Sequence, residues 1–381
     1  MKKHISILGS TGSIGVNALK IAEFLSKDIK IEYLTANKNF ELLIEQTKKN
    51  KPKSICLVDK RFYKNLKKGI NTKQVEILVG REGLLEICKR KDVHVMLNGL
   101  VGASGMEPTL SAIKAGVNVA LANKESLVMA GGIINKAKKL SGAKIFPVDS
   151  EHSAIWQCLV GENFKDIRRI ILTGSGGPFR NRDLDTFHDI SVEEALKHPN
   201  WDMGKKISID SATMMNKCLE VIEAYWLFKL DPKKIDIIIH PQSIVHSMVE
   251  FNDGSIKAQM GVPDMKVPIQ YALTFPSHSK SPWKKLDFLS CGDLTFQAPD
   301  YDRFPSLQLA YQALKNGGTA SAALNLSNDY SVQKFLEKKI IFTDIYKINH
   351  FSLQNHPWIK HPNLNDLRNL DDWVKNHVNE F

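Results

Sequence analysis

The segment Gly9-Ser10-Thr11-Gly12-Ser13-Ile14-Gly15 decides the fold of this chain. A β-branched stretch, His4–Leu8, precedes it and an amphipathic stretch, Ile14–Leu25, follows it, so the segment predicts a turn from a strand into a helix. Glycines in such a turn let the backbone approach a pyrophosphate, which then lies at the amino terminus of the helix. The alternative is an ordinary glycine-rich turn without a ligand. The position of the segment after the first strand favours a dinucleotide site.

Residues 1–150 alternate strand-like and helix-like stretches throughout. The predicted strands are His4–Leu8, Ile29–Thr35, Ser54–Val58, Val75–Val79, Val93–Leu97, Val117–Leu121 and Ile145–Val148, and the predicted helices are Ile14–Leu25, Phe40–Lys49, Leu84–Lys89 and Glu107–Ala115. Alternation of this kind implies right-handed crossovers and a parallel sheet. We therefore expect an α/β protein whose residues 1–150 form a Rossmann-like, doubly wound dinucleotide-binding domain.

The end of the second predicted strand indicates which dinucleotide is bound. A site for NAD usually has an acidic residue here to hold the ribose hydroxyls. This chain instead has Asn37, Lys38 and Asn39, a cation flanked by amides that suits a 2′-phosphate. Hydroxyls of Thr11 and Ser13 add possible contacts. We expect NADPH rather than NADH.

A second polar segment, Asn123-Lys124-Glu125, directly follows the predicted strand Val117–Leu121. Strand ends in open α/β sheets face the ligand crevice, so these side chains are expected near the nicotinamide and its ribose. Asn123 also suits the amino-terminal cap of a helix, and the two interpretations are compatible.

The pattern changes after residue 150. Residues 151–280 read as an α+β domain that we expect to hold the catalytic, metal and substrate sites, and Asn252-Asp253-Gly254 predicts a hairpin in it. Residues 281–305 read as a connector, and residues 306–381 as a helical domain with segments Leu307–Asn316, Thr319–Leu326, Ser331–Glu337 and Asp366–Val378.

Composition narrows the function classes. The formal charge is +11, but only nine of the 52 basic residues are Arg and the lysines are scattered, which argues against nucleic acid and favours recruitment of a small anion. No run of 18 apolar residues predicts a membrane span, and the amino terminus shows no signal-peptide pattern, so we expect a cytoplasmic protein. The five cysteines are far apart and read as reduced thiols.

Asp149 and Glu151 are candidate metal ligands. In extended backbone, residues two apart point to one side, so these carboxylates would converge, and oxygen ligands suit Mg²⁺ or Mn²⁺. The alternative is the start of a helix over Ser153–Leu159. Glu220 offers a third carboxylate in a predicted helix, Met214–Phe228.

A phosphate site is expected from the segment that precedes Glu220. Ser211, Asn216 and Lys217 are read as polar groups at the amino terminus of that helix, where a phosphate is favoured. A glycine loop, Thr173–Phe179, follows another predicted strand, and its Ser175 could bind the same phosphate. Residues 198–204 read as a loop that closes over a small substrate, although Trp201 could instead anchor the core.

Seven motifs occur together in this chain in a family-like order. They are GSTGSIG (9–15), LANKES (121–126), PVDSEH (147–152), LTGSGGPFR (172–180), HPNW-x-MG (198–204), SIDSATMMNK-x-LE (208–220) and IHPQS-x-VHSMV (239–249). With them the chain resembles the 1-deoxy-D-xylulose 5-phosphate reductoisomerase family from about residue 5 to residue 330. The family makes 2-C-methyl-D-erythritol 4-phosphate for isoprenoid synthesis and depends on NADPH and a divalent metal. The resemblance also implies a homodimer with dimerisation strands in residues 151–280.

The resemblance assigns roles to individual positions. Metal ligands fall on Asp149, Glu151 and Glu220, which with Lys124 and His198 form the expected catalytic set. Substrate contacts fall on Lys124, Ser150, Glu151, Ser175, His198, Trp201, Ser211, Asn216, Lys217 and Glu220. Cofactor contacts fall on Thr11, Gly12, Ser13, Ile14, Asn37, Lys38, Asn39, Asn123, Glu125, Met203 and Gly204. Asn37 departs from the family, where many relatives have glycine.

The implied reaction is a rearrangement of 1-deoxy-D-xylulose 5-phosphate followed by hydride transfer from NADPH. The metal would act as a Lewis acid on the substrate oxygens, and a retro-aldol route and an α-ketol route both remain open. One alternative is a plain NADP-dependent reductase or semialdehyde dehydrogenase without rearrangement. A basic protein that binds RNA through a nucleotide fold is the alternative from another class.

Overall fold

The computed structural model describes residues 2–197 and 204–381, and the chain forms two compact units. The first unit comprises Met1–Ser126, Gly132–Ser153 and Asp264–Trp283, and the second comprises Leu127–Gly131, Ala154–Pro263 and Lys284–Phe381. The chain therefore enters each unit more than once, and the helices α6 (Glu125–Ser141) and α7 (Ser150–Leu159) contribute residues to both.

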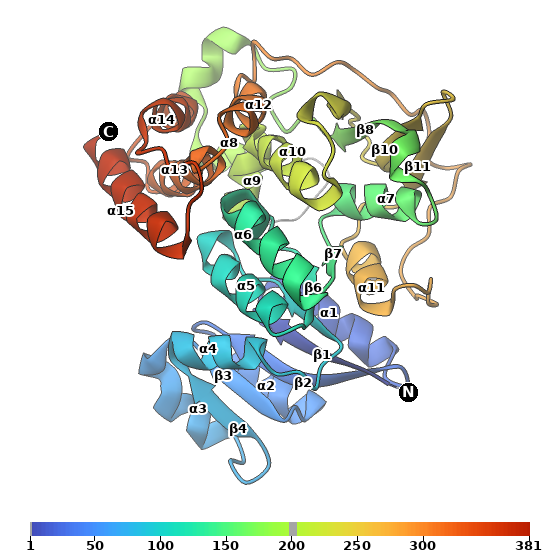
Figure 1. The fold of residues 1–381 in the computed structure, drawn as a ribbon, viewed down its shortest axis with the longest axis vertical. Helices are drawn as coiled ribbons and strands as arrows, with labels where there is room; N and C mark the ends of the chain where they lie inside the picture. Colours follow the sequence, from blue (N-terminus) through green and yellow to red (C-terminus); the bar gives the residue numbers. More distant parts are fainter. Residues whose placement is uncertain (1, 198–203) are drawn as a thin grey trace. The chain divides into compact units, whose positions relative to one another are not determined.

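A seven-stranded parallel sheet forms the centre of the first unit (Figure 1). Its strands are β1 (Lys3–Leu8), β2 (Ile29–Ala36), β3 (Ser54–Leu57), β4 (Glu76–Val79), β5 (Val95–Asn98), β6 (Asn118–Leu121) and β7 (Ile145–Pro147). The helices that this unit adds are α1 (Ser13–Phe24), α2 (Phe40–Asn50), α3 (Tyr63–Gly69), α4 (Gly80–Cys88), α5 (Met106–Lys114) and α11 (Lys266–Thr274). This confirms the predicted α/β class with a Rossmann-like sheet.

The strand order of this sheet is β4-β3-β2-β1-β5-β6-β7, so successive strands are added on one side of β1 up to β4 and on its other side from β5 onward. The connection from β1 leads to β2 on one side, whereas β5 pairs with β1 on the other, with Ile5 opposite Val95. A reversal of this kind leaves a crevice at the carboxyl ends of the two central strands, where ligands of open α/β sheets bind. The Gly9–Gly15 turn follows β1 at this point.

The second unit contains a four-stranded sheet of order β11-β10-β8-β9. Its strands are β8 (Ile167–Gly174), β9 (Ile235–Ile239), β10 (Val245–Phe251) and β11 (Ile256–Met260), and its helices are α8 (Val192–Ala195), α9 (Lys205–Ala212), α10 (Met215–Phe228), α12 (Ser306–Asn316), α13 (Ala320–Leu336), α14 (Phe342–Asn355) and α15 (Leu364–Glu380). The predicted hairpin is confirmed, because β10 and β11 are antiparallel and Gly254 has a φ of 86° between them.

One hydrophobic core joins the sheet and the carboxyl-terminal helices of the second unit. It includes Leu172 on β8, Leu219 on α10, Leu307 on α12, Leu324 on α13 and Ile345 on α14. The carboxyl-terminal helices therefore pack with the central sheet in one compact unit, whereas the sequence led us to expect a separate helical domain. The segment 264–280 also groups with the first unit rather than with the domain expected over 151–280.

The helix predictions need correction in three respects. The two helices predicted within 319–337 are one continuous helix, α13, since Asn328 and its neighbours are helical as well as buried. The helices α3, α8, α9, α11 and α14 were not predicted. The helix predicted over Met214–Phe228 begins at Met215, because Met214 has a φ of 60° and is the amino-terminal cap of this helix rather than part of it. None of the described helices is both long enough and apolar enough to cross a membrane.

Candidate active site

The three glycines of the first turn differ in what surrounds them. Gly9 has a φ of 73°, and a Cβ there would lie 3.0 Å from the Gly99 carbonyl oxygen. A Cβ on Gly15 would lie 2.4 Å from the Gly9 carbonyl oxygen. A Cβ on Gly12 would meet only that same oxygen, at an ordinary 3.4 Å. Gly9 and Gly15 are thus required by the fold, whereas the space beside Gly12 suits the close approach of a ligand.

The start of α1 is open to an anion. Gly12 is its amino-terminal cap and supplies no side chain, and both Gly12 and Ser13 are exposed. The first N–H groups of a helix have no partner within the helix, and the helix dipole favours negative charge there. The residues present therefore fit the pyrophosphate of a dinucleotide.

The turn is held in place from the neighbouring strand and helix. The Ser10 backbone N–H donates to the Thr35 carbonyl oxygen at 2.8 Å, and the Ser10 hydroxyl donates to Gln46 on α2 at 2.7 Å. The Gln46 amide donates back to the Ser10 carbonyl oxygen at 2.8 Å. Thr35 and Gln46 were not among the predicted site residues, because neither lies in a glycine motif.

The three candidates in the segment after β2 are all exposed, and one of them also caps a helix. Asn39 caps α2 by accepting a hydrogen bond from the Leu42 N–H at 3.1 Å. Lys38 and Asn37 are exposed. A cation is thus presented at the end of β2.

Asn123 is fully buried, and its side chain is engaged by the protein. Its amide group donates to the carbonyl oxygens of Leu100 at 3.0 Å and Gly102 at 2.9 Å, and also to Glu125 at 3.1 Å. Its side-chain oxygen accepts from the Ser126 N–H at 3.1 Å. The Asn123 side chain thus bonds to the first turn of α6, whose amino-terminal cap residue is Lys124, and its other bonds hold the loop after β5 against the start of this helix.

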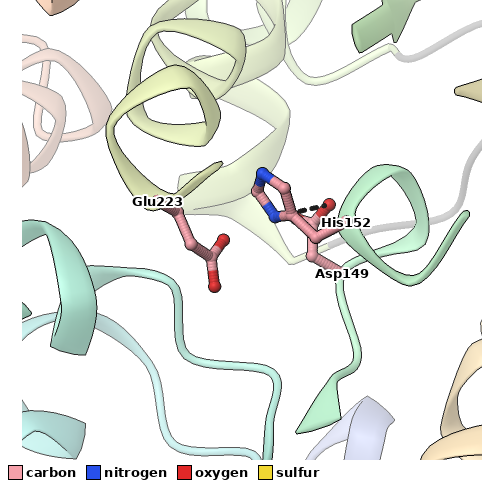
Figure 2. A group of neighbouring side chains, drawn as sticks. All are labelled: Asp149, His152 and Glu223. Carbon is pink, nitrogen blue, oxygen red and sulfur yellow. Dashed lines mark ion pairs between the residues drawn. The ribbon is translucent and has the colours of Figure 1, made fainter. Parts of the chain in front are cut away.

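Lys124 lies beside the first candidate metal ligand. Its Nζ is 2.5 Å from an Asp149 carboxylate oxygen, and both side chains are only 10% exposed. His152 contacts the other Asp149 oxygen through Nδ1 at 3.6 Å, and Figure 2 shows its ring next to that carboxylate. Figure 2 also draws Glu223, which belongs to α10. The structure thus adds His152 to the candidates, and its position three residues after Asp149 was the available signal.

The backbone of Asp149 and Glu151 differs from the extended form that we expected. Ser150 and Glu151 are already helical, because α7 begins three residues earlier than predicted. The Asp149 side chain accepts from the Glu151 N–H at 3.2 Å, and Ser150 donates to Glu151 at 2.6 Å. The alternative of a helix start is therefore the one observed. Each carboxylate still offers an oxygen to a metal.

In the second unit the glycine loop after β8 packs against the end of α9. A Cβ on Gly177 would lie 2.6 Å from the Ser211 carbonyl oxygen, and one on Gly174 would lie 3.0 Å from Cε of Lys217. The Ser175 hydroxyl accepts from the Gly177 N–H at 3.3 Å. The structure thus places the loop that carries Ser175 beside Ser211 and Lys217, which lie far from it in sequence.

We predicted that the polar groups before Glu220 lie together at the amino terminus of one helix. This prediction was wrong. Ser211 lies in the last turn of α9, and Asn216 and Lys217 lie in the first turn of α10. Met214, in the left-handed conformation at the joint, allows the two helix ends to meet, at the cost of strain that only well-packed surroundings support. Of the three predicted phosphate contacts, only Asn216 and Lys217 therefore lie at the amino terminus of α10.

Glu220 is fully buried and already accepts two donors. Asn216 donates to one of its oxygens at 2.5 Å, and Lys217 forms an ion pair with the other. The buried carboxylate is thus oriented by the two residues that we expect at the phosphate. His198, Trp201 and Met203 lie outside the described residues, and Gly204 caps α9.

Comparison with known proteins identifies the family. The model described as "1-deoxy-D-xylulose 5-phosphate reductoisomerase" matches residues 5–131, and two models for the carboxyl-terminal domains of this family match residues 145–228 and 260–377. The chain is 48% identical to the 1-deoxy-D-xylulose 5-phosphate reductoisomerase of Chloroherpeton thalassium, over 99% of this chain and 97% of that protein. The chain belongs to the 1-deoxy-D-xylulose 5-phosphate reductoisomerase family. This confirms the resemblance found in the sequence.

Other members of the family extend this comparison. The Acetivibrio thermocellus reductoisomerase is 47% identical over the full length of both chains. The solved Zymomonas mobilis reductoisomerase in complex with NADPH is 41% identical, with a TM-score of 0.93 over 99% of this chain and 98% of that one. A second solved reductoisomerase, in complex with NADPH, fosmidomycin and magnesium, has a TM-score of 0.94 and 40% identity over 99% of this chain and 98% of that one. The family resemblance therefore covers the whole fold.

Proposed function

We propose that the protein converts 1-deoxy-D-xylulose 5-phosphate to 2-C-methyl-D-erythritol 4-phosphate, using NADPH and a divalent metal. Family membership over the full chain carries this proposal. A solved relative that binds NADPH and magnesium supports both cofactors. Magnesium and manganese both suit a site of carboxylate oxygens.

Asp149, Glu151 and Glu220 are the proposed metal ligands. Their carboxylate oxygens are the hard donors that such an ion prefers. When bound, the ion supplies Lewis acidity that polarises the substrate carbonyl and stabilises negative charge during the rearrangement. Lys124 beside Asp149 is placed to balance charge and to donate a proton or hydrogen bond to a substrate oxygen.

The phosphate of the substrate is proposed to bind where Ser175, Ser211, Asn216 and Lys217 come together. The packing of the glycine loop against Ser211 and Lys217 supports this site. Ser150 and His198 are the remaining proposed substrate contacts, with Trp201 as a cover. Binding energy from the phosphate orients the reacting carbons, so a substrate without phosphate should lose rate as well as affinity.

NADPH is proposed to bind at the crevice between β1 and β5. Its pyrophosphate would lie on the Thr11–Ile14 backbone, and its 2′-phosphate near Lys38 with Asn37 and Asn39. Asn123 and Glu125 would support the ribose of the nicotinamide, with Met203 and Gly204 beside the ring. The open space at Gly12 and the exposed Lys38 support this assignment.

A semialdehyde dehydrogenase without rearrangement is disfavoured by the cysteines. Such an enzyme needs an activated thiolate. Burial raises the pKa of the Cys158 thiol to about 11 and that of the Cys56 thiol to about 12. Burial likewise raises the pKa of the Cys218 thiol. A raised pKa keeps a thiol protonated at neutral pH, so these three cysteines do not supply the activated thiolate.

We also propose a cytoplasmic homodimer formed through β11. In the described sheet β11 pairs only with β10, so its outer edge can accept another strand. Ile256 on this strand is 52% exposed, and Leu289 in the same unit is 98% exposed. Sedimentation that shows only monomer at micromolar concentration would argue against the dimer.

The direct test is the absorbance loss of NADPH in the presence of 1-deoxy-D-xylulose 5-phosphate and Mg²⁺. We expect turnover that disappears after chelation and returns with Mg²⁺ or Mn²⁺. Identification of 2-C-methyl-D-erythritol 4-phosphate among the products separates rearrangement from plain reduction. No oxidation of NADPH with this substrate, together with salt-sensitive RNA binding, would instead favour the nucleic-acid alternative.

A further inference from the structure

Helix α13 has buried polar side chains where a core helix is normally apolar. Asn325, Ser327, Asn328 and Ser331 are all fully buried. Burying a polar group is unfavourable unless it is hydrogen-bonded, and the bonds of such groups fix one arrangement of the helices. The partners of these residues therefore show which arrangement is being fixed.

A chain of hydrogen bonds runs from α14 through α13 to α9. Ser327 donates to the side-chain oxygen of Asn349 on α14 at 2.9 Å, and the Asn349 amide donates to Asn328 at 3.1 Å. The Asn328 amide in turn donates to a carboxylate oxygen of Asp210 on α9 at 2.7 Å. Asp210 is separated from Asn328 by 118 positions, so this bond ties two distant parts of the second unit.

Lys206 connects the same two helices, α9 and α13, through ion pairs. Its Nζ is 2.6 Å from the other Asp210 oxygen and 3.0 Å from an oxygen of Asp329 on α13. The Asp210 side chain is only 3% exposed, so its charge depends on these partners. Both oxygens of one buried carboxylate are therefore held, one by an ammonium group and the other by an amide.

Asp210 directly precedes Ser211, whose carbonyl group packs against the glycine loop at Gly177. Rotation of α9 would move Ser211 relative to Ser175 and Lys217. We infer that Asp210 and Asn328 are positioning residues, which hold α9 so that Ser211 faces the phosphate of the substrate. This inference rests on the proposed function, and it assigns to the carboxyl-terminal helices a part in substrate binding.

The test compares Asn328→Leu with a matched control, Asn325→Leu. Both asparagines are fully buried on α13, but both amide atoms of Asn325 are without a hydrogen-bond partner in the described structure. For folded Asn328→Leu we expect KM for 1-deoxy-D-xylulose 5-phosphate to rise about tenfold and kcat to fall by less than about threefold. We expect the control to leave both constants nearly unchanged. Equal effects in the two variants, or an unchanged KM in Asn328→Leu, would overturn the inference.

Amide hydrogen exchange supplies a readout without substrate. We expect Asn328→Leu to speed exchange in residues 205–212 while α15 stays protected, and the control to speed neither. If the wild-type protein does not convert the substrate, the proposed function fails, and the exchange comparison still decides whether Asn328 holds α9. Uniformly faster exchange in Asn328→Leu would reduce the effect to general destabilisation and contradict the inference.

A double variant in which the two side chains are swapped tests the same bond if Asn328→Leu does not fold. In the double variant Asp210→Asn, Asn328→Asp, the amide at position 210 can donate to the carboxylate at position 328. Asn328→Asp alone places two carboxylates together and should raise KM more than the double variant does. No recovery in the double variant would argue against a positioning bond between these two residues.

Discussion

The two units present their candidate sites in different ways. In the first unit the contact surface is backbone, contributed by one continuous turn in which Gly12 leaves space for a ligand. In the second unit it is made of side chains from the loop after β8, the end of α9 and the start of α10. A backbone site is damaged by adding atoms, and a side-chain site is damaged by removing or neutralising them.

The largest expected effect is in the side-chain site. Glu220→Gln keeps the shape of the side chain but removes a charged ligand, so turnover should fall by about a thousandfold or more. The dissociation constant of NADPH should stay within about twofold, because Glu220 is not among the proposed contacts of the cofactor. Steady-state kinetics and fluorescence titration of NADPH measure the two quantities. Glu193→Gln, an exposed residue on α8, is the surface control, and full activity in Glu220→Gln would remove Glu220 from the metal site.

The backbone site is tested by two matched glycine substitutions. Gly12→Ala adds a methyl group into the ligand space, so KM for NADPH should rise about tenfold with unchanged stability. Gly15→Ala adds the same group 2.4 Å from the Gly9 carbonyl oxygen, so it should lower the free energy of unfolding by about 1–3 kcal/mol. Kinetics and urea unfolding should give opposite patterns for the two variants. Equal destabilisation by both would make Gly12 a packing glycine.

A smaller effect is expected at the 2′-phosphate. Lys38→Ala removes one exposed cation, and the preference for NADPH over NADH should fall about fivefold, since an exposed ion pair contributes little. The ratio of kcat/KM for the two cofactors measures this preference. Lys30→Ala, at the one exposed position of β2, is a control that should leave the ratio unchanged. An unchanged ratio in Lys38→Ala would move 2′-phosphate recognition to other residues.

The two units also differ in how much of their structure could be predicted from the sequence. The β1 turn and its sheet were predictable because strand, turn and helix signals are contiguous and local. The wrong predictions fall where tertiary packing outweighs local pattern. Met214 is an example, because nothing in its side chain signals a left-handed backbone, and only the meeting of α9 and α10 explains it.

The proposed metal ligands show a further limit of sequence patterns. Asp149 and Glu151 were recognisable by residue type, but their helical backbone was not, because the capping of α7 by Asp149 competes with an extended segment. The positioning role that we infer for Asn328 had no sequence signal, since its bond to the distant Asp210 is known only from the fold. Residue chemistry could be predicted here, whereas the partners of each residue required the fold.

The proposed metal ligands Asp149, Glu151 and Glu220 are distant along the chain and would bind one divalent ion together. Titration with Mn²⁺, followed by the electron paramagnetic resonance signal of the free ion, tests it without turnover. We predict one tight site per chain in the wild-type protein, and loss of that site in both Asp149→Asn and Glu220→Gln. Tight binding of one Mn²⁺ that persists in either variant would contradict the account.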